Sequence, residues 1–115
     1  MAITFHLTPL EVWTTQRHNA DYAPEAFASE GFIHCTDGES NVIDVGNRYY
    51  TGDPREMVCL VIDRDAVRAE IRYEDPGHIF PHIYGPLNLD AVQAVRGVDR
   101  ETDGRFVRIG SPISV

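Results

Sequence analysis

The most restrictive feature of the sequence is the apolar run from Met57 to Ile62, MVCLVI. A strand with one face in water alternates apolar and polar residues, whereas this run offers apolar side chains to both sides. It therefore predicts a central β-strand that is covered on both faces. A fold built around such a strand needs a sheet with other parts of the chain packed on each side.

Other segments predict shorter strands around this one. Residues 3–8 alternate strictly, with Ile3, Phe5 and Leu7 on the apolar face, which is typical of a half-buried strand. The sequence predicts further strands at residues 31–36, 70–73, 82–84, 91–98 and 105–109.

Helices are predicted mainly in the first half of the chain. Thr8 and Glu11 have the spacing of a capping box, so a helix is expected to begin at Pro9 and to fade near residue 19. A second short helix is expected over residues 24–30, ending where Gly31 can adopt the left-handed conformation of a C-terminal cap.

A third helix is expected after residue 37. Thr36 or Asp37 can cap it, and Val42, Val45 and Tyr49 form its apolar stripe. Because helices come early and strands late, the sequence predicts an α+β fold with a mostly antiparallel split β-sheet and short helices. We expect a single domain over residues 1–115, with a loose tail from about residue 110.

Charge narrows the expected partners. The chain has 18 acidic and 10 basic residues, all of the latter arginine, for a formal net charge of −8. Such a protein lacks the basic surface that attracts nucleic acids and anionic membranes, so neither is an expected partner. No apolar run approaches the roughly 20 residues of a membrane span, and the N-terminus does not resemble a signal peptide. We therefore expect a soluble, cytoplasmic protein, with Cys35 and Cys59 as buried free thiols.

Three histidines occupy comparable places on the predicted strands. His6, His34 and His82 each lie on the polar face of a strand whose other face is apolar. If the three strands are neighbours, these faces line one cleft together with threonine and tyrosine side chains, and such a cleft suits a sugar or a nucleotide. The alternative for each histidine is a half-buried side chain with satisfied hydrogen bonds.

Two other kinds of site remain open at this point. Three neutral imidazoles can hold zinc or iron, although each would come from a separate strand. Cys35 could be a nucleophile, but its neighbour His34 points to the opposite face of the strand and could not serve it as a base.

Five stretches of the chain resemble a known bacterial family. They are FHLTPLEVW, EGFIHCT, NRYYTG, CLVID and FPHIYGPLNLDAV, in this order over nearly the whole chain. They are similar to the domain of unknown function 952 family, which in turn resembles the ADP-ribosyltransferase-like superfamily and most of all the RNA 2′-phosphotransferases. The resemblance implies an ADP-ribosyltransferase-like fold with NAD as a possible substrate and no certain cofactor.

The same resemblance implies which residues contact the nucleotide. His6 and Thr8 would match one NAD-gripping motif, and His34 and Thr36 the other, so that their side chains bind the ribose. Asn47 and Arg48 would lie on the following helix. Tyr49, Tyr50 or Tyr84 would stack on a ring. His6, His34 and His82 are the residues expected to take part in catalysis.

The sequence also departs from the transferase pattern. Many of these enzymes carry a glutamate on a late strand, and the corresponding stretch here has His82 and Tyr84 but no carboxylate. Leu7 replaces the glycine of the first motif. The expectation is therefore a protein that binds NAD or an ADP-ribose-type nucleotide and could transfer ADP-ribose. A non-enzymatic nucleotide-binding or protein-interaction module is the alternative, and a three-histidine metal site is the second.

Overall fold

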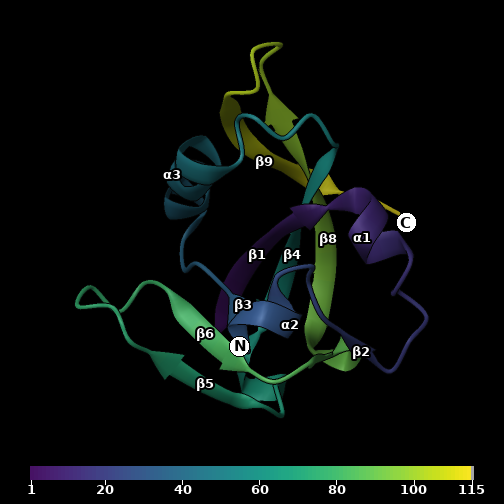
Figure 1. Ribbon diagram of the computed structural model, residues 1–115, viewed down its shortest axis with the longest axis vertical. Coiled ribbons are helices and arrows are strands. Elements are labelled where there is room, and N and C mark those ends of the chain that lie inside the picture. Colours follow the sequence, from purple (N-terminus) through teal and green to yellow (C-terminus); the bar gives the residue numbers. More distant parts are fainter. Residues whose placement is uncertain (115) are drawn as a thin grey trace.

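The computed structural model describes residues 1–114, and its largest element is a four-stranded antiparallel sheet (Figure 1). The strand order in this sheet is β1–β4–β8–β9. The strands are β1 (Ile3–Pro9), β4 (Met57–Asp63), β8 (Val92–Arg100) and β9 (Phe106–Pro112). This sheet and the smaller antiparallel sheets confirm the predicted α+β class.

Two smaller sheets and several short helices complete the fold. A three-stranded sheet has the order β3–β6–β5, and a two-stranded sheet pairs β2 with β7. Their strands are β2 (Asp21–Tyr22), β3 (Ile33–His34), β5 (Glu70–Tyr73), β6 (Pro81–Tyr84) and β7 (Leu87–Asn88). The helices are α1 (Leu10–Thr14), α2 (Phe27–Glu30) and α3 (Glu39–Tyr49), with single 3₁₀ turns η1 (Arg64–Ala66) and η2 (Leu89–Ala91). Within residues 1–114, no helix has the length and apolar character needed to cross a membrane.

Strand β4 is the central strand that its apolar run predicts. Val58, Leu60 and Ile62 are inaccessible to solvent in a core that also contains Trp13 and Tyr22. The other face belongs to a second core, formed by Met57 and Cys59 of β4 with Phe5, Leu7, Val42, Phe106 and Ile109. The sheet therefore separates two apolar cores, with α3 covering the second of them.

The polar face of β1 is buried as well, which corrects the prediction of a half-buried strand. His6 pairs with Leu60 of β4, so it lies on the face of the sheet that carries the first core. Thr4 and Thr8 share that face and are buried there. The alternation of the sequence identified the two faces but not the packing of Tyr22 over the polar one.

The helix starts differ from the sequence prediction because their capping residues have other partners. Helix α1 has no side-chain cap at its start. The hydroxyl of Thr8 is hydrogen-bonded to Tyr22, and the carboxylate of Glu11 accepts from Arg55. Helix α1 is also shorter than predicted. The predicted cap of α2 is confirmed, because Gly31 is left-handed with φ +81°.

The residue before helix α3 is Gly38, with φ +86°, and no side chain caps the helix, so the predicted cap by Thr36 or Asp37 is wrong. Val42 is buried as predicted, but Tyr49 is 69% exposed and does not belong to an apolar stripe. The close approach of α3 to β9 instead depends on Gly46, where a Cβ atom would lie 2.6 Å from the ring of Phe106.

The end of the chain is more ordered than predicted. Strand β9 continues to Pro112, which pairs with Arg96 of β8, so the expectation of a loose tail from residue 110 is wrong for this part. Val115 lies outside the described residues. The short strands β2 and β7 were not predicted, because two residues carry no periodic signal.

Candidate functional site

A cleft of about 910 Å³ opens between α3, the β3–β6–β5 sheet and the end of β1. In Figure 1, α3 lies on one side of β1, and β6 and β5 lie below it. The cleft is lined by all of the predicted site residues except Asn47 and Tyr84, namely His6, Thr8, His34, Thr36, Arg48, Tyr49, Tyr50 and His82. The structure thus brings the three histidines to one cleft, but it gives them different surroundings.

His6 is the buried member of the three, with 5% of its surface exposed. Its Nδ1 donates to the carbonyl oxygen of His34 at 2.6 Å, and its Nε2 lies 3.0 Å from the hydroxyl of Tyr22. The same hydroxyl is 2.9 Å from that of Thr8. Burial lowers the pKa of His6 to about 4, so the ring is neutral at pH 7. His6 and Thr8 therefore fit the alternative interpretation, in which a side chain is part of the core and its hydrogen bonds are satisfied there.

His34 and His82 form the accessible pair. They are directly opposite each other in the register of β3 and β6, and their ring centroids are 5.2 Å apart. Their inward-facing neighbours Ile33 and Ile83 are buried in the first core, which fixes the two imidazoles on the outer face. The ring of Phe32 stacks on His82 at a centroid distance of 4.2 Å.

A glutamate is hydrogen-bonded to each of these imidazoles. His34 Nε2 is 3.2 Å from both carboxylate oxygens of Glu30, at the end of α2. His82 Nδ1 is 3.3 Å from Glu74 Oε1, a carboxylate that also accepts from the hydroxyl of Tyr84. These hydrogen bonds, from Tyr84 first and then from His82, lower the pKa of Glu74 and keep it ionised.

Two predicted ligand-binding residues lie elsewhere. Tyr84 is on β6, but its hydroxyl is bonded to Glu74 and the guanidinium of Arg72 lies 4.5 Å from its ring centroid. Both ends of the Asn47 side-chain amide are bonded to the backbone of Phe106, with Nδ2 donating to its carbonyl and Oδ1 accepting from its N–H. Asn47 thus joins α3 to β9, and it is not among the residues that line the cleft.

The remaining predicted residues lie on α3 and just after it. Arg48 makes no side-chain hydrogen bond or salt bridge within residues 1–114. Tyr49 beside it is largely exposed, whereas Tyr50 is half-buried and its pKa is raised mainly by that burial. The side chain of Thr36 is buried, and its backbone bridges to Phe5 of β1.

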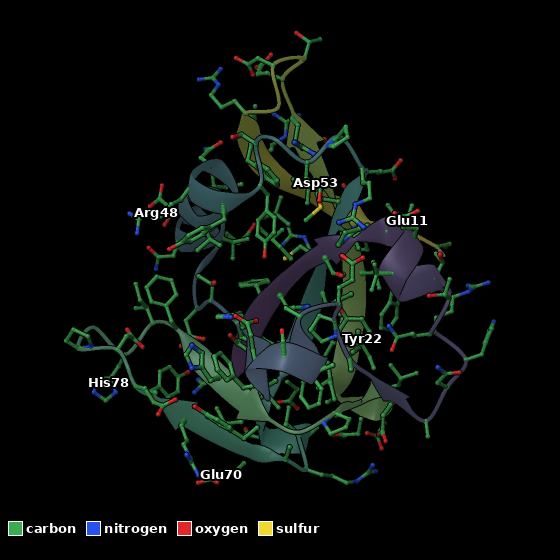
Figure 2. All side chains as sticks on the ribbon, in the orientation of Figure 1. Glu11, Tyr22, Arg48, Asp53, Glu70 and His78 are labelled. Carbon is green, nitrogen blue, oxygen red and sulfur yellow. The ribbon has the colours of Figure 1, made fainter. Side chains whose placement is uncertain are left out.

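Two arginines that hold one wall of the cleft, Arg55 and Arg100, are not among the residues predicted from the sequence. Arg55 donates to Glu11, Glu25 and Asp53, and its hydrogen bonds lower the pKa of Asp53 to about 2. Figure 2 shows Glu11 and Asp53 on the same part of the molecule, although they are far apart in the sequence.

Arg100 of β8 fixes the backbone of the same wall. Its guanidinium donates to the carbonyl oxygens of Tyr50, Thr51, Asp53, Arg55 and Gly104. The guanidinium carbon also lies 4.6 Å from the ring centroid of Phe106. No spacing in the sequence relates Arg100 to this loop, so only the tertiary structure reveals the contact.

Neither cysteine chemistry nor the three-histidine metal site fits this arrangement. Cys35 and Cys59 are buried free thiols, and burial raises the pKa of both, so they stay protonated. Both ring nitrogens of His6 are already hydrogen-bonded. Among residues 1–114, no group of three or more His, Cys, Asp or Glu side chains is arranged to hold a metal ion.

The geometry defines a small α+β protein with a polar and aromatic cleft beside a three-stranded sheet. Residues 7–95 match the family of proteins of unknown function DUF952, and the chain belongs to this family. No curated protein matches the chain.

Solved structures of one protein share the fold. The crystal structure of protein CC0527 from Caulobacter crescentus superposes with a TM-score of 0.78 at 19% identity, over 92% of this chain and 94% of that one. The solution NMR structure of CC0527 gives a TM-score of 0.70 at 20% identity, with 90% of each chain covered. At this identity the likeness extends to the fold alone.

Proposed function

We propose that the cleft binds a nucleotide of the ADP-ribose type, such as NAD or ADP-ribose. The observation that carries the proposal is that one cleft of about 910 Å³ is lined by Arg48, which has no side-chain partner within residues 1–114, by the exposed ring of Tyr49 and by two accessible imidazoles. Ligand sites of this kind commonly enclose about 300–1,000 Å³ and combine apolar walls with a few polar groups.

Each part of such a nucleotide has a suitable partner. Arg48 supplies a free guanidinium for the pyrophosphate, and Tyr49 offers a ring on which the adenine can stack. His34 and His82 offer ring nitrogens to ribose hydroxyls. Five carboxylates also line the cleft, those of Glu25, Glu30, Asp44, Asp53 and Asp75. Arg55 balances part of the charge of Glu25 and Asp53, which reduces the repulsion of a phosphate on that side.

We expect the substitution Arg48→Gln to weaken the binding of NAD and of ADP-ribose at least about tenfold, because a charge-assisted hydrogen bond to phosphate is lost. The measurement is a titration of the protein with each nucleotide, monitored through the amide chemical shifts, and the residues whose shifts change also locate the site. Arg17→Gln is the matched control. Arg17 is exposed, lies outside the cleft and carries the same charge, so its removal should leave the dissociation constant unchanged.

A second measurement separates binding from turnover. Incubating the protein with NAD and assaying nicotinamide would reveal ADP-ribosyl transfer or hydrolysis by steady release, whereas a binding module would release none. The proposal fails if millimolar NAD and ADP-ribose cause no shifts at residues lining the cleft, or if Arg17→Gln weakens binding as much as Arg48→Gln. Nucleic acid is not an expected ligand, given the net charge of −8.

A further inference from the structure

His34 and His82 use different ring nitrogens for their glutamates. His34 is bonded through Nε2 to Glu30, and His82 through Nδ1 to Glu74. A carboxylate only accepts hydrogen bonds, so the bonded nitrogen of each ring carries a proton. The opposite nitrogens, Nδ1 of His34 and Nε2 of His82, have no hydrogen-bond partner within residues 1–114.

The structure holds these two rings in fixed positions next to each other. Their backbones are paired across β3 and β6, their centroids are 5.2 Å apart, and Phe32 packs against both rings. The side chain of His34 is 55% exposed and that of His82 is 22% exposed, so both are accessible from the cleft. An imidazole that is oriented by a carboxylate on one nitrogen and open on the other is the usual arrangement of a general acid or base.

We propose that His34 and His82 act as a general base and a general acid at the anomeric carbon of a reducing sugar, opening and closing its ring. The sugar is the terminal ribose of an ADP-ribose-type ligand, and in this respect the proposal rests on the proposed function. The anomeric hydroxyl oxygen and the ring oxygen are bonded to the same carbon. Two adjacent imidazoles can therefore each contact one of these oxygens at a hydrogen-bond distance of about 2.8 Å.

The reaction needs only the sugar and one proton from water, which His82 takes up on Nε2 before the reaction while Nδ1 still donates to Glu74. His34 Nδ1 takes the proton of the anomeric hydroxyl, the oxygen forms a carbonyl, and the bond from the anomeric carbon to the ring oxygen breaks. The electron pair of that bond goes to the ring oxygen, which takes a proton from Nε2 of protonated His82. After rotation of the aldehyde, closure on its other face runs the same transfers in reverse, so both histidines return to their initial states and the anomer is inverted.

The local charge favours a neutral reacting group over a phosphodiester. Glu30 and Glu74 lie next to the imidazoles, while the nearby guanidinium of Arg72 is already bonded to Glu70. An anionic phosphorus centre would be repelled by these carboxylates, whereas a hemiacetal carries no charge. The proposal therefore excludes phosphodiester hydrolysis as the reaction of this pair.

The test measures the exchange between the α and β anomers of D-ribose and of ADP-ribose by exchange NMR spectroscopy. We expect the protein to raise the rate at least about tenfold over buffer in a saturable manner, since general acid–base catalysis typically contributes 10²–10⁴-fold. His34→Gln and His82→Gln should each return the rate to within about twofold of buffer. His18→Gln removes an exposed imidazole outside the cleft and should retain the full rate.

Further measurements on the unmodified protein distinguish the loss of a catalytic group from a variant that fails to fold. Nitrogen-15 shifts of the unmodified protein should identify protons on His34 Nε2 and His82 Nδ1, and Glu30→Gln should change the proton position of His34 alone. Ring nitrogens protonated the other way round would overturn the proposal. A ribose rate equal to buffer, or cleavage of a ribose 2′,3′-cyclic phosphate that depends on both histidines, would also overturn it.

The proposal and the proposed function can fail separately. ADP-ribose that binds in the cleft without faster anomer exchange would refute the acid–base pair and leave nucleotide binding intact. Faster exchange of ribose, without detectable binding of NAD or ADP-ribose, would support the pair and refute the nucleotide.

Discussion

The contribution of His6 to the free energy of unfolding is expected to fall by about 3 kcal/mol as the pH drops from 6.5 to 4. In the unfolded chain this imidazole takes up a proton near its ordinary pKa of 6.5, whereas in the folded protein burial keeps it neutral down to about pH 4. Protons therefore favour the unfolded chain throughout this interval. The stabilisation is complete above pH 6.5 and is lost toward pH 4.

Denaturant unfolding at a series of pH values measures this loss, and NMR titration of the His6 ring measures its pKa directly. A His6 ring that titrates near pH 6.5 in the folded protein would contradict the expectation. It would mean that burial does not exclude the second proton from this ring.

The substitution Gly104→Ala is expected to lower the free energy of unfolding by about 3 kcal/mol, at the upper end of the range for strained backbone positions. Gly104 lies in the turn between β8 and β9 with φ +98°, where an L residue is strained. A Cβ atom there would also overlap the carbonyl oxygen of Thr51, a backbone atom. Either the turn or the cleft wall that Arg100 holds must then move.

Gly52→Ala is a matched control in the neighbouring loop. A Cβ atom on Gly52 meets nothing within 4 Å, so the substitution should change the free energy of unfolding by no more than about 0.5 kcal/mol. Denaturant unfolding of both variants gives the comparison. Equal losses for the two substitutions would show that Gly104 is not a position with a special steric requirement.

The fold class was predictable because its signal is local. The apolar run of β4 indicated a strand covered on both faces, and the order of short helices and alternating strands indicated the antiparallel α+β arrangement. The helix starts were less predictable, because a capping pattern does not reveal competing partners. Thr8 is engaged by Tyr22 and Glu11 by Arg55, and both contacts cross between elements.

The site was predictable where it depends on strand periodicity. The alternation around His34 and His82 placed both imidazoles on the polar faces of their strands, and β3 and β6 are indeed neighbours. The same periodicity could not separate His6 from them, since it does not indicate that Tyr22 covers that face. Glu30 and Glu74 come from segments flanking the strands, so their contacts with the imidazoles depend on turn geometry.

The contact between Asn47 and Phe106 has a consequence for self-association. Strand β9 is the outermost strand of the large sheet, and unpaired backbone groups on such an edge can template intermolecular pairing. The amide of Asn47 occupies both the N–H and the carbonyl of Phe106. An incoming chain would have to displace that amide before adding a strand there, so the first residue of this edge is protected from aggregation.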